Sequence, residues 1–78
     1  MTNLEKYDRE FINMFGVKKE ELPTLKYRGI KKWDSMGHMD LMSALEERFD
    51  ISISTLDVLD FTDYEKGKTI LAKYGVEI

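Results

Sequence analysis

The chain has 78 residues, a net charge of −3, 42% hydrophobic residues, 35% charged residues and one proline, which together predict one small globular domain and exclude a disordered or fibrous chain. It contains no cysteine and one histidine, so a disulfide framework, a thiolate metal site and a cysteine nucleophile are excluded and little is left for a zinc site. The uncharged stretches are far short of the roughly 20 residues that cross a bilayer, and the first residues lack the basic and then apolar pattern of a secretory signal, so we expect a cytoplasmic protein.

The charge is distributed unevenly along the chain. Residues 1–33 carry eight basic and five acidic side chains, residues 34–65 carry nine acidic side chains and one arginine, and residues 66–78 carry three lysines and one glutamate. Affinity for nucleic acid comes largely from Lys and Arg that replace condensed counterions. The acidic middle third therefore disfavours a nucleic-acid partner and favours a basic protein surface.

The first element is predicted to be a helix over residues 3–15. Thr2 followed three residues later by Glu5 is a capping-box pattern, and Gly16 is a typical stop at the C-terminal end. Between them, apolar residues recur at helical spacing: Leu4, Tyr7, Phe11, Met14 and Phe15.

Residues 17–33 show no sustained period and contain Pro23 and Gly29, so we expect a long crossover loop. Connections longer than about 12 to 15 residues are usually functional or disordered. Apolar side chains nevertheless offer anchors that hold this loop across the core: Leu22, Leu25, Tyr27, Ile30 and Trp33.

A second helix is expected to begin after Asp34, as its N-cap, and to continue to Phe49. Its broad apolar stripe consists of Met36, Met39, Leu41, Met42, Leu45 and Phe49. Its polar face presents Asp40, Glu46 and Glu47 to solvent.

Residues 50–53 are expected to form an extended link to a short helix over residues 55–60. Ser54 is the candidate cap of this helix, and Leu56 and Leu59 are expected to point inward.

Thr62 and Glu65 form a second capping-box pattern that is expected to open the last helix, with Gly75 beyond its end. Gly67 costs this helix up to about 1 kcal/mol relative to alanine, so we expect it to allow close approach of another helix. The chain as a whole is predicted to be a single all-α domain over residues 1–78. We expect a small four-helix bundle with three longer helices, a short third helix and a long loop between the first two.

The most informative motif is Asp34-Ser35-Met36, where the long loop meets the most acidic helix. It resembles the acyl carrier protein family, whose signature is Asp-Ser-Leu or Asp-Ser-Met at the start of the second helix. The resemblance continues without a gap through Asp40, Leu41, Ala44-Leu45-Glu46-Glu47, Phe49-Asp50 and Ile53, and Thr62 falls where the family often opens its last helix. Less specifically, it extends to the first helix, the long loop and the total length.

The resemblance implies that Ser35 is the attachment site of 4'-phosphopantetheine. A phosphopantetheinyl transferase would let the serine hydroxyl attack the pyrophosphate of coenzyme A. The thiol of the resulting arm would hold acyl or aminoacyl groups as thioesters and deliver them to ligases, synthases or transferases of fatty-acid or secondary-metabolite biosynthesis. The chain would then be a monomeric carrier and not itself an enzyme.

The site is also reasonable on physical grounds. A serine in the first helical turn exposes its hydroxyl, and a phosphodiester there lies near unpaired N–H groups and the positive end of the helix dipole. Asp34 is expected to cap the helix, and in the family this aspartate also helps the transferase to recognise its target. An isolated Asp-Ser pair, however, is most often only a helix start.

The docking face for partner enzymes is expected on the second helix, since basic patches of partner enzymes recognise this helix in carrier proteins. Its expected contributors are Met36, Asp40, Glu46 and Glu47. Opposed charge raises encounter rates more than affinity, which suits a shuttle. The alternatives are a solvated helix face without a partner for the acids, and plain core packing for the methionines rather than a cleft for an acyl chain.

Several residues depart from the fatty-acid carriers. Gly37 and Arg48 stand where many of these carriers have acids, and Trp33 stands where smaller or aliphatic residues are usual. Four basic residues precede the serine: Lys26, Arg28, Lys31 and Lys32. Asp-Ser-Met-Gly also resembles the D-alanyl carrier of teichoic acid modification, so the resemblance leaves the cargo open.

Three other functions are compatible with parts of the sequence. The basic loop invites a DNA-binding helix-turn-helix, but the helix that follows is acidic. Ser35, His38 and Asp34 could form a catalytic group, although no oxyanion hole is evident and His38 is expected to be an exposed helix residue. The third alternative is an unmodified protein-interaction module with a carrier-like fold.

Overall fold

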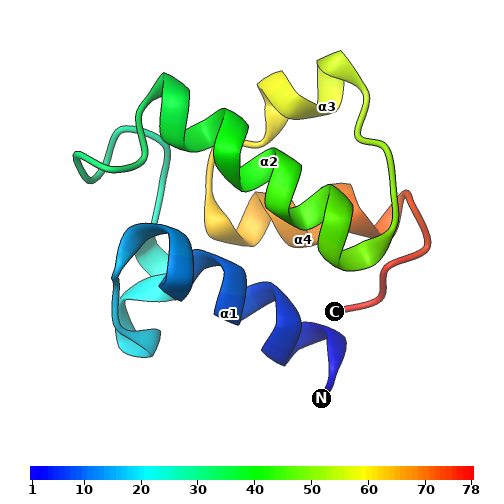
Figure 1. Ribbon diagram of the computed structural model, residues 1–78, viewed down its shortest axis with the longest axis horizontal. Helices are drawn as coiled ribbons and strands as arrows, with labels where there is room; N and C mark the ends of the chain where they lie inside the picture. The colour runs from blue at the N-terminus through cyan, green and yellow to red at the C-terminus, as the bar shows by residue number, and fades with distance from the viewer.

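The computed structural model describes residues 1–78 and contains only helices (Figure 1). Their bounds are α1 Asn3–Phe15, the 3-10 helix η1 Lys19–Thr24, α2 Ser35–Phe49, α3 Thr55–Asp60 and α4 Tyr64–Ala72. α2 crosses the front of the molecule with α1 below it and α3 above it, and the two termini lie at the same end (Figure 1). The predicted all-α fold with a short third helix and a long first crossover is confirmed, whereas η1 within the crossover was not predicted. Every helix is too short or too polar to span a membrane.

The core is built around aromatic rings from three separate segments. Phe11 of α1 packs edge-on against Trp33 of the crossover and Tyr7, with ring centroids 5.5 Å and 4.9 Å apart, and it stacks on Phe61. All four side chains are almost completely buried. Because aromatic side chains bury large areas and such pairs add about 0.5–1.5 kcal/mol beyond burial, this cluster stabilises the packing of α1 against the crossover and the segment between α3 and α4.

The ends of α1 follow from local hydrogen bonds, as the sequence predicts. The N–H of Glu5 donates to Thr2 Oγ1 at 3.1 Å, and the N–H of Thr2 donates to Glu5 Oε1 at 2.9 Å. The hydrogen bonds that the Glu5 carboxylate makes with Thr2, first of all with its N–H, lower the pKa of this carboxyl. Gly16 ends the helix in the left-handed region with φ 67°, where its N–H donates to the carbonyl of Ile12.

The crossover packs on the core, as expected. Leu22, Leu25 and Trp33 are buried, and Tyr27 and Ile30 are half-buried. The first part of the crossover coils into η1, whose start is capped by the Glu21 carboxylate, since the N–H of Lys18 donates to Glu21 Oε1 at 3.0 Å. A six-residue 3-10 helix has too short a period to be detected in the hydrophobic pattern.

The orientation predicted for α3 is wrong. Leu56 and Leu59 are 75% and 70% exposed. The inner face of the helix instead carries Asp57, whose carboxylate accepts hydrogen bonds from Lys73 Nζ at 2.7 Å and from the Tyr74 hydroxyl. These charge-assisted bonds to the chain after α4, and not leucine burial, fix which face of α3 turns inward.

The cap predicted for α4 is displaced by one residue. Asp63 is the N-cap, because its Oδ1 accepts a hydrogen bond from the N–H of Lys66 at 2.7 Å. Thr62 instead donates to the other Asp63 oxygen at 3.3 Å, so the predicted Thr62–Glu65 capping box is wrong. Gly75 lies beyond the helix end, as predicted, with φ 83°.

Gly67 is closely packed, but its close neighbours are two aromatic side chains, whereas the sequence predicted the close approach of another helix. A Cβ at this position would lie 2.1 Å from the Tyr7 hydroxyl oxygen and 2.2 Å from Cζ of Phe61. Both neighbours are core rings that cannot move without disturbing the aromatic cluster.

The substitution Gly67→Ala should therefore destabilise the protein, by about 3 kcal/mol, because overpacking outweighs the better helix propensity of alanine. Urea unfolding measures the loss. The control Thr69→Ala, at an exposed position of the same helix, should change the unfolding free energy by less than about 0.5 kcal/mol. A Gly67→Ala variant as stable as the unmodified sequence would contradict the tight contact.

Candidate functional site

The start of α2 is fixed by Asp34, as the sequence predicts. Asp34 has an extended backbone, and its Oδ1 accepts a hydrogen bond from the N–H of Gly37 at 2.8 Å. Ser35 is therefore the first residue of the helix, and its side chain is exposed. The hydroxyl is accessible from solvent at the junction of crossover and helix.

Trp33 anchors this junction in the core. Its indole is fully buried and stacks on Phe15 with ring centroids 5.4 Å apart. Its Nε1 donates a hydrogen bond to His38 Nδ1 at 2.9 Å, one turn into α2. The anchor is two residues before Ser35 and therefore restricts where the hydroxyl can lie.

His38 is half-buried, so the expectation of an exposed residue is wrong. Because indole N–H can only donate, His38 Nδ1 must accept, and the proton of the neutral ring lies on Nε2. His38 Nε2 then donates to the carbonyl of Val58 at 2.8 Å, which links α2 to α3. Both ring nitrogens are occupied, and the Asp34 carboxylate caps the helix, so these groups do not form a hydrogen-bonded chain with Ser35.

Two side chains of the crossover contact the Ser35 hydroxyl. Ser35 Oγ lies 3.1 Å from the Tyr27 hydroxyl and accepts a hydrogen bond from Arg28 Nη2 at 3.2 Å. The hydrogen bonds with Ser35 and Arg28 lower the pKa of the Tyr27 phenol. Sequence reasoning did not find these contacts, since it assigned Tyr27 to the core and Arg28 to a general basic loop. No local sequence pattern predicts these contacts, because they form only when the loop folds back onto the start of α2.

Backbone hydrogen bonds close the loop on itself and tie it to the segment before α4, and Gly37 lets it lie close to α2. The N–H of Tyr27 donates to the carbonyl of Thr62 at 2.9 Å, and the N–H of Arg28 donates to the carbonyl of Trp33 at 2.8 Å. A Cβ on Gly37 would lie 1.9 Å from the carbonyl oxygen of Lys32. The glycine that departs from the fatty-acid carriers is thus required for the loop to lie on the first turn of α2.

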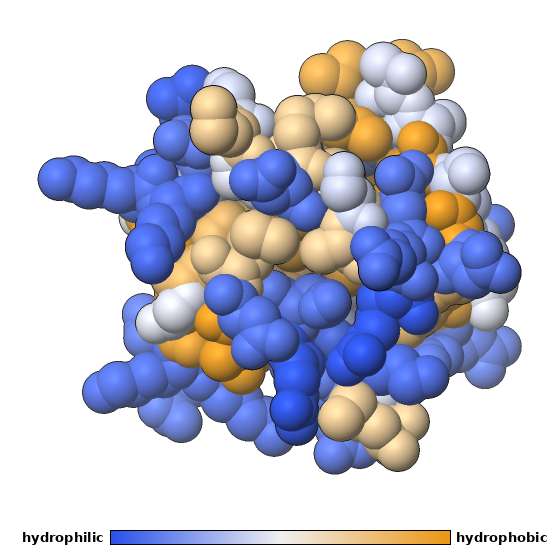
Figure 2. Space-filling model, in the orientation of Figure 1, coloured by the Kyte–Doolittle hydropathy of each residue, from blue (hydrophilic) through white to orange (hydrophobic).

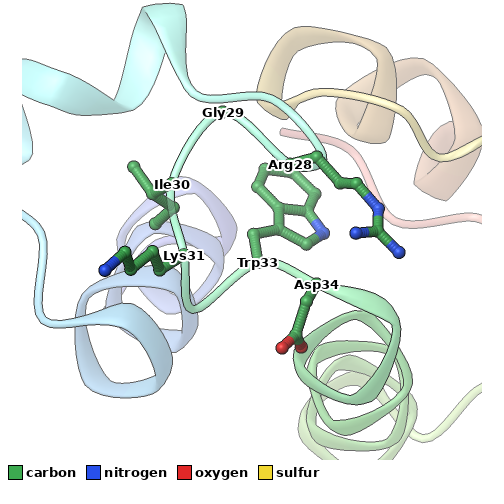
Figure 3. A pocket seen from close by; sticks show the side chains of 6 residues that line it. All are labelled: Arg28, Gly29, Ile30, Lys31, Trp33 and Asp34. Carbon is green, nitrogen blue, oxygen red and sulfur yellow. The ribbon is translucent and has the colours of Figure 1, made fainter.

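A surface pocket of about 460 Å³ opens beside this junction (Figure 3). It is lined by Arg28, Gly29, Ile30, Lys31, Trp33 and Asp34. In Figure 3 the Arg28 guanidinium extends toward the start of α2, whereas the Lys31 side chain points away on the opposite side. Of the basic residues that line the pocket, only Arg28 therefore reaches Ser35.

Tyr27 lines a separate, smaller cavity of about 130 Å³. Its lining is mostly apolar and includes His38, Val58, Leu59, Phe61 and Thr62. A cavity of this volume does not enclose a long alkyl chain.

The predicted docking residues differ in their environment. Asp40 and Glu47 are exposed, as expected. Glu46 is half-buried, and its Oε2 accepts a hydrogen bond from the N–H of Ile53 at 2.8 Å, so its carboxylate holds the link after α2.

Apolar side chains are exposed next to these acids. Apolar surface gathers over α3 and the adjacent part of α2 (Figure 2). The exposed large side chains there are Met36, Met39, Leu56 and Leu59. The core packing expected for the methionine stripe is therefore wrong for Met36 and Met39 and correct for Met42, which is buried.

The residues suited to a bound group are those around Ser35. No set of three or more acidic, histidine or cysteine side chains converges in a way that could bind a metal ion. An arginine, a tyrosine hydroxyl and a serine hydroxyl in mutual contact instead suit a phosphate.

Comparison with protein-family models, with curated proteins and with solved structures gives no match.

Replacing His38 by leucine should lower the unfolding free energy by about 1–3 kcal/mol, since it leaves the buried Trp33 N–H without an acceptor. Equilibrium unfolding with Trp33 fluorescence measures the change. The control Met39→Leu, at an exposed position on the same helix, should be nearly neutral. Equal stability of the two variants would contradict the hydrogen-bonded link through His38.

Proposed function

We propose that the protein is a carrier that holds acyl or aminoacyl groups as thioesters on a 4'-phosphopantetheine arm attached to Ser35. The observation that carries the proposal is the exposed Ser35 hydroxyl at the first position of an acidic helix, in contact with the guanidinium of Arg28. The family resemblance of Asp34-Ser35-Met36 and the following helix supports it.

The residues present fit a phosphodiester on Ser35. The hydroxyl is exposed, the adjacent Arg28 supplies positive charge, and the dipole of α2 favours an anion at its first turn. The Asp34 carboxylate is engaged by the N–H of Gly37. When bound, the arm supplies a terminal thiol that forms the thioester with the cargo.

The attachment requires a transferase and coenzyme A. Ser35 Oγ forms a bond to the phosphorus on the pantetheine side of the pyrophosphate, and the bond from this phosphorus to the bridging oxygen breaks. Adenosine 3',5'-bisphosphate leaves with that oxygen, and the serine proton passes to a base of the transferase. Asp34 keeps Ser35 at the helix start during this reaction.

Docking depends on the acidic and apolar surface of α2. Asp40 and Glu47 supply exposed negative charge for a basic patch of the partner, and Met36, 75% exposed, supplies an apolar contact next to Ser35. Glu46 contributes to this surface indirectly, because the hydrogen bond that it accepts from the Ile53 N–H holds the link after α2 in place. Electrostatic attraction speeds encounter and still permits release.

Incubation with coenzyme A and a promiscuous phosphopantetheinyl transferase should increase the intact mass by about 340 Da. The gain should disappear in Ser35→Ala and persist in the matched control Ser43→Ala, which removes an exposed serine from the same helix. Mass spectrometry of the intact chain provides the measurement. No gain in the unmodified sequence would instead favour the interaction module.

Reversing the charge of Asp40 by Asp40→Lys should slow loading by about 10-fold at low salt, because it removes attraction to the basic transferase surface. Glu77→Lys makes the same charge change at an exposed residue far from α2 in sequence and should have little effect. Initial rates of mass gain at several salt concentrations test this. Equal rates for the two variants would argue against docking through α2.

A further inference from the structure

The charged side chain that contacts Ser35 Oγ is an arginine, although the hydroxyl itself is neutral. Arg28 has five N–H donors and a permanent charge, yet Nη2 donates to the uncharged Ser35 Oγ. The ion pairs of the chain, Lys68–Glu65 and Lys73–Asp57, lie elsewhere. The charge on Arg28 therefore has no carboxylate partner and suits an anion attached at Ser35.

The loop backbone fixes the direction of Arg28. Its φ is 64°, in the left-handed region that non-glycine residues rarely adopt and that costs about 1 kcal/mol or more. The bond from the Arg28 N–H to the Trp33 carbonyl closes the loop around this conformation. The guanidinium also lies over the Tyr27 ring, with Cζ 5.4 Å from the ring centroid, which limits its movement further.

We propose that Tyr27 and Arg28 form a phosphate clamp that binds the non-bridging oxygens of a phosphate group on Ser35. This inference rests on the proposed function, because attachment of the arm is what brings a phosphodiester to Ser35. It adds to that function a binding site, on the carrier itself, for the phosphodiester that joins the arm to Ser35.

The geometry suits this role. The phosphorus lies one P–O bond from Ser35 Oγ and the non-bridging oxygens lie one further bond away, so donors now 3.1 Å and 3.2 Å from Oγ reach these oxygens after small side-chain rotations. Arginine offers two parallel N–H groups to a phosphate, and charge-assisted bonds are about twice as strong as neutral ones. The Tyr27 hydroxyl, which already lies beside Ser35 Oγ, supplies one further donor.

The clamp has a consequence for the carrier cycle. It holds the first bonds of the arm against the loop, so the arm leaves the protein in one direction instead of swinging freely from Ser35. A partner enzyme then meets the thiol from a restricted set of positions, which lowers the entropy cost of delivery.

The test uses phosphoserine introduced genetically at position 35, which needs neither transferase nor coenzyme A. Its second pKa is ordinarily about 6 and can be followed by phosphorus NMR. A nearby cation favours the dianion, so the clamp should lower this pKa by roughly half a unit to one unit relative to the Arg28→Gln variant. Lys31→Gln removes the same charge from the same loop, from a side chain that points away (Figure 3), and should leave the pKa unchanged.

A second measurement uses the arm itself. The loaded protein should unfold at a higher temperature than the unloaded protein, by on the order of 5 °C, and Arg28→Gln should remove most of this difference. Tyr27→Phe should remove a smaller part of the difference in unfolding temperature, since the positive charge of Arg28 remains.

The outcomes separate the two proposals. If the phosphoserine pKa is the same with Arg28 in place as in the Arg28→Gln variant, the clamp is overturned, even if Ser35 accepts the arm. A transferase that adds no mass would overturn the carrier function, whereas a phosphoserine pKa that depends on Arg28 would still establish the clamp.

Discussion

The burial of Trp33 is the contact on which the position of Ser35 depends. The indole is fully buried against Phe15 and donates its N–H to His38, yet it is only two residues from an exposed hydroxyl. Truncation of a buried tryptophan typically costs about 3–5 kcal/mol, so the crossover cannot easily leave the core here. The exposed site is therefore rigid because the residue just before it is part of the core.

The two elements joined at this junction carry opposite charges. The crossover supplies Arg28 at the Ser35 hydroxyl, whereas α2 carries the exposed acids Asp40 and Glu47. In the proposed carrier, the acids attract a partner enzyme and the arginine retains the phosphate on Ser35. Gly37 makes the arginine contact possible, because any side chain there would push the Lys32 carbonyl, and with it the loop, away from the helix.

The elements of the fold could be predicted where their causes are local. The capping groups Thr2, Asp34 and Ser54 accept hydrogen bonds from N–H groups three residues ahead, so the sequence is sufficient to find these helix starts. The face of α3 and the contacts of Ser35 could not be predicted in this way. Asp57 meets residues 16 and 17 positions away, and Tyr27 and Arg28 reach Ser35 only because the loop pairs with residues near α4.

Locating the added group on the chain tests the central claim most directly. After treatment with the transferase, trypsin releases residues 33–48 as one peptide that contains both Ser35 and Ser43, and residues 49–66 as another that contains Ser52 and Ser54. Fragmentation of these peptides assigns the group to one hydroxyl. The account predicts phosphopantetheine on Ser35 alone. A group on any of the other three serines, or unmodified peptides throughout, would contradict it.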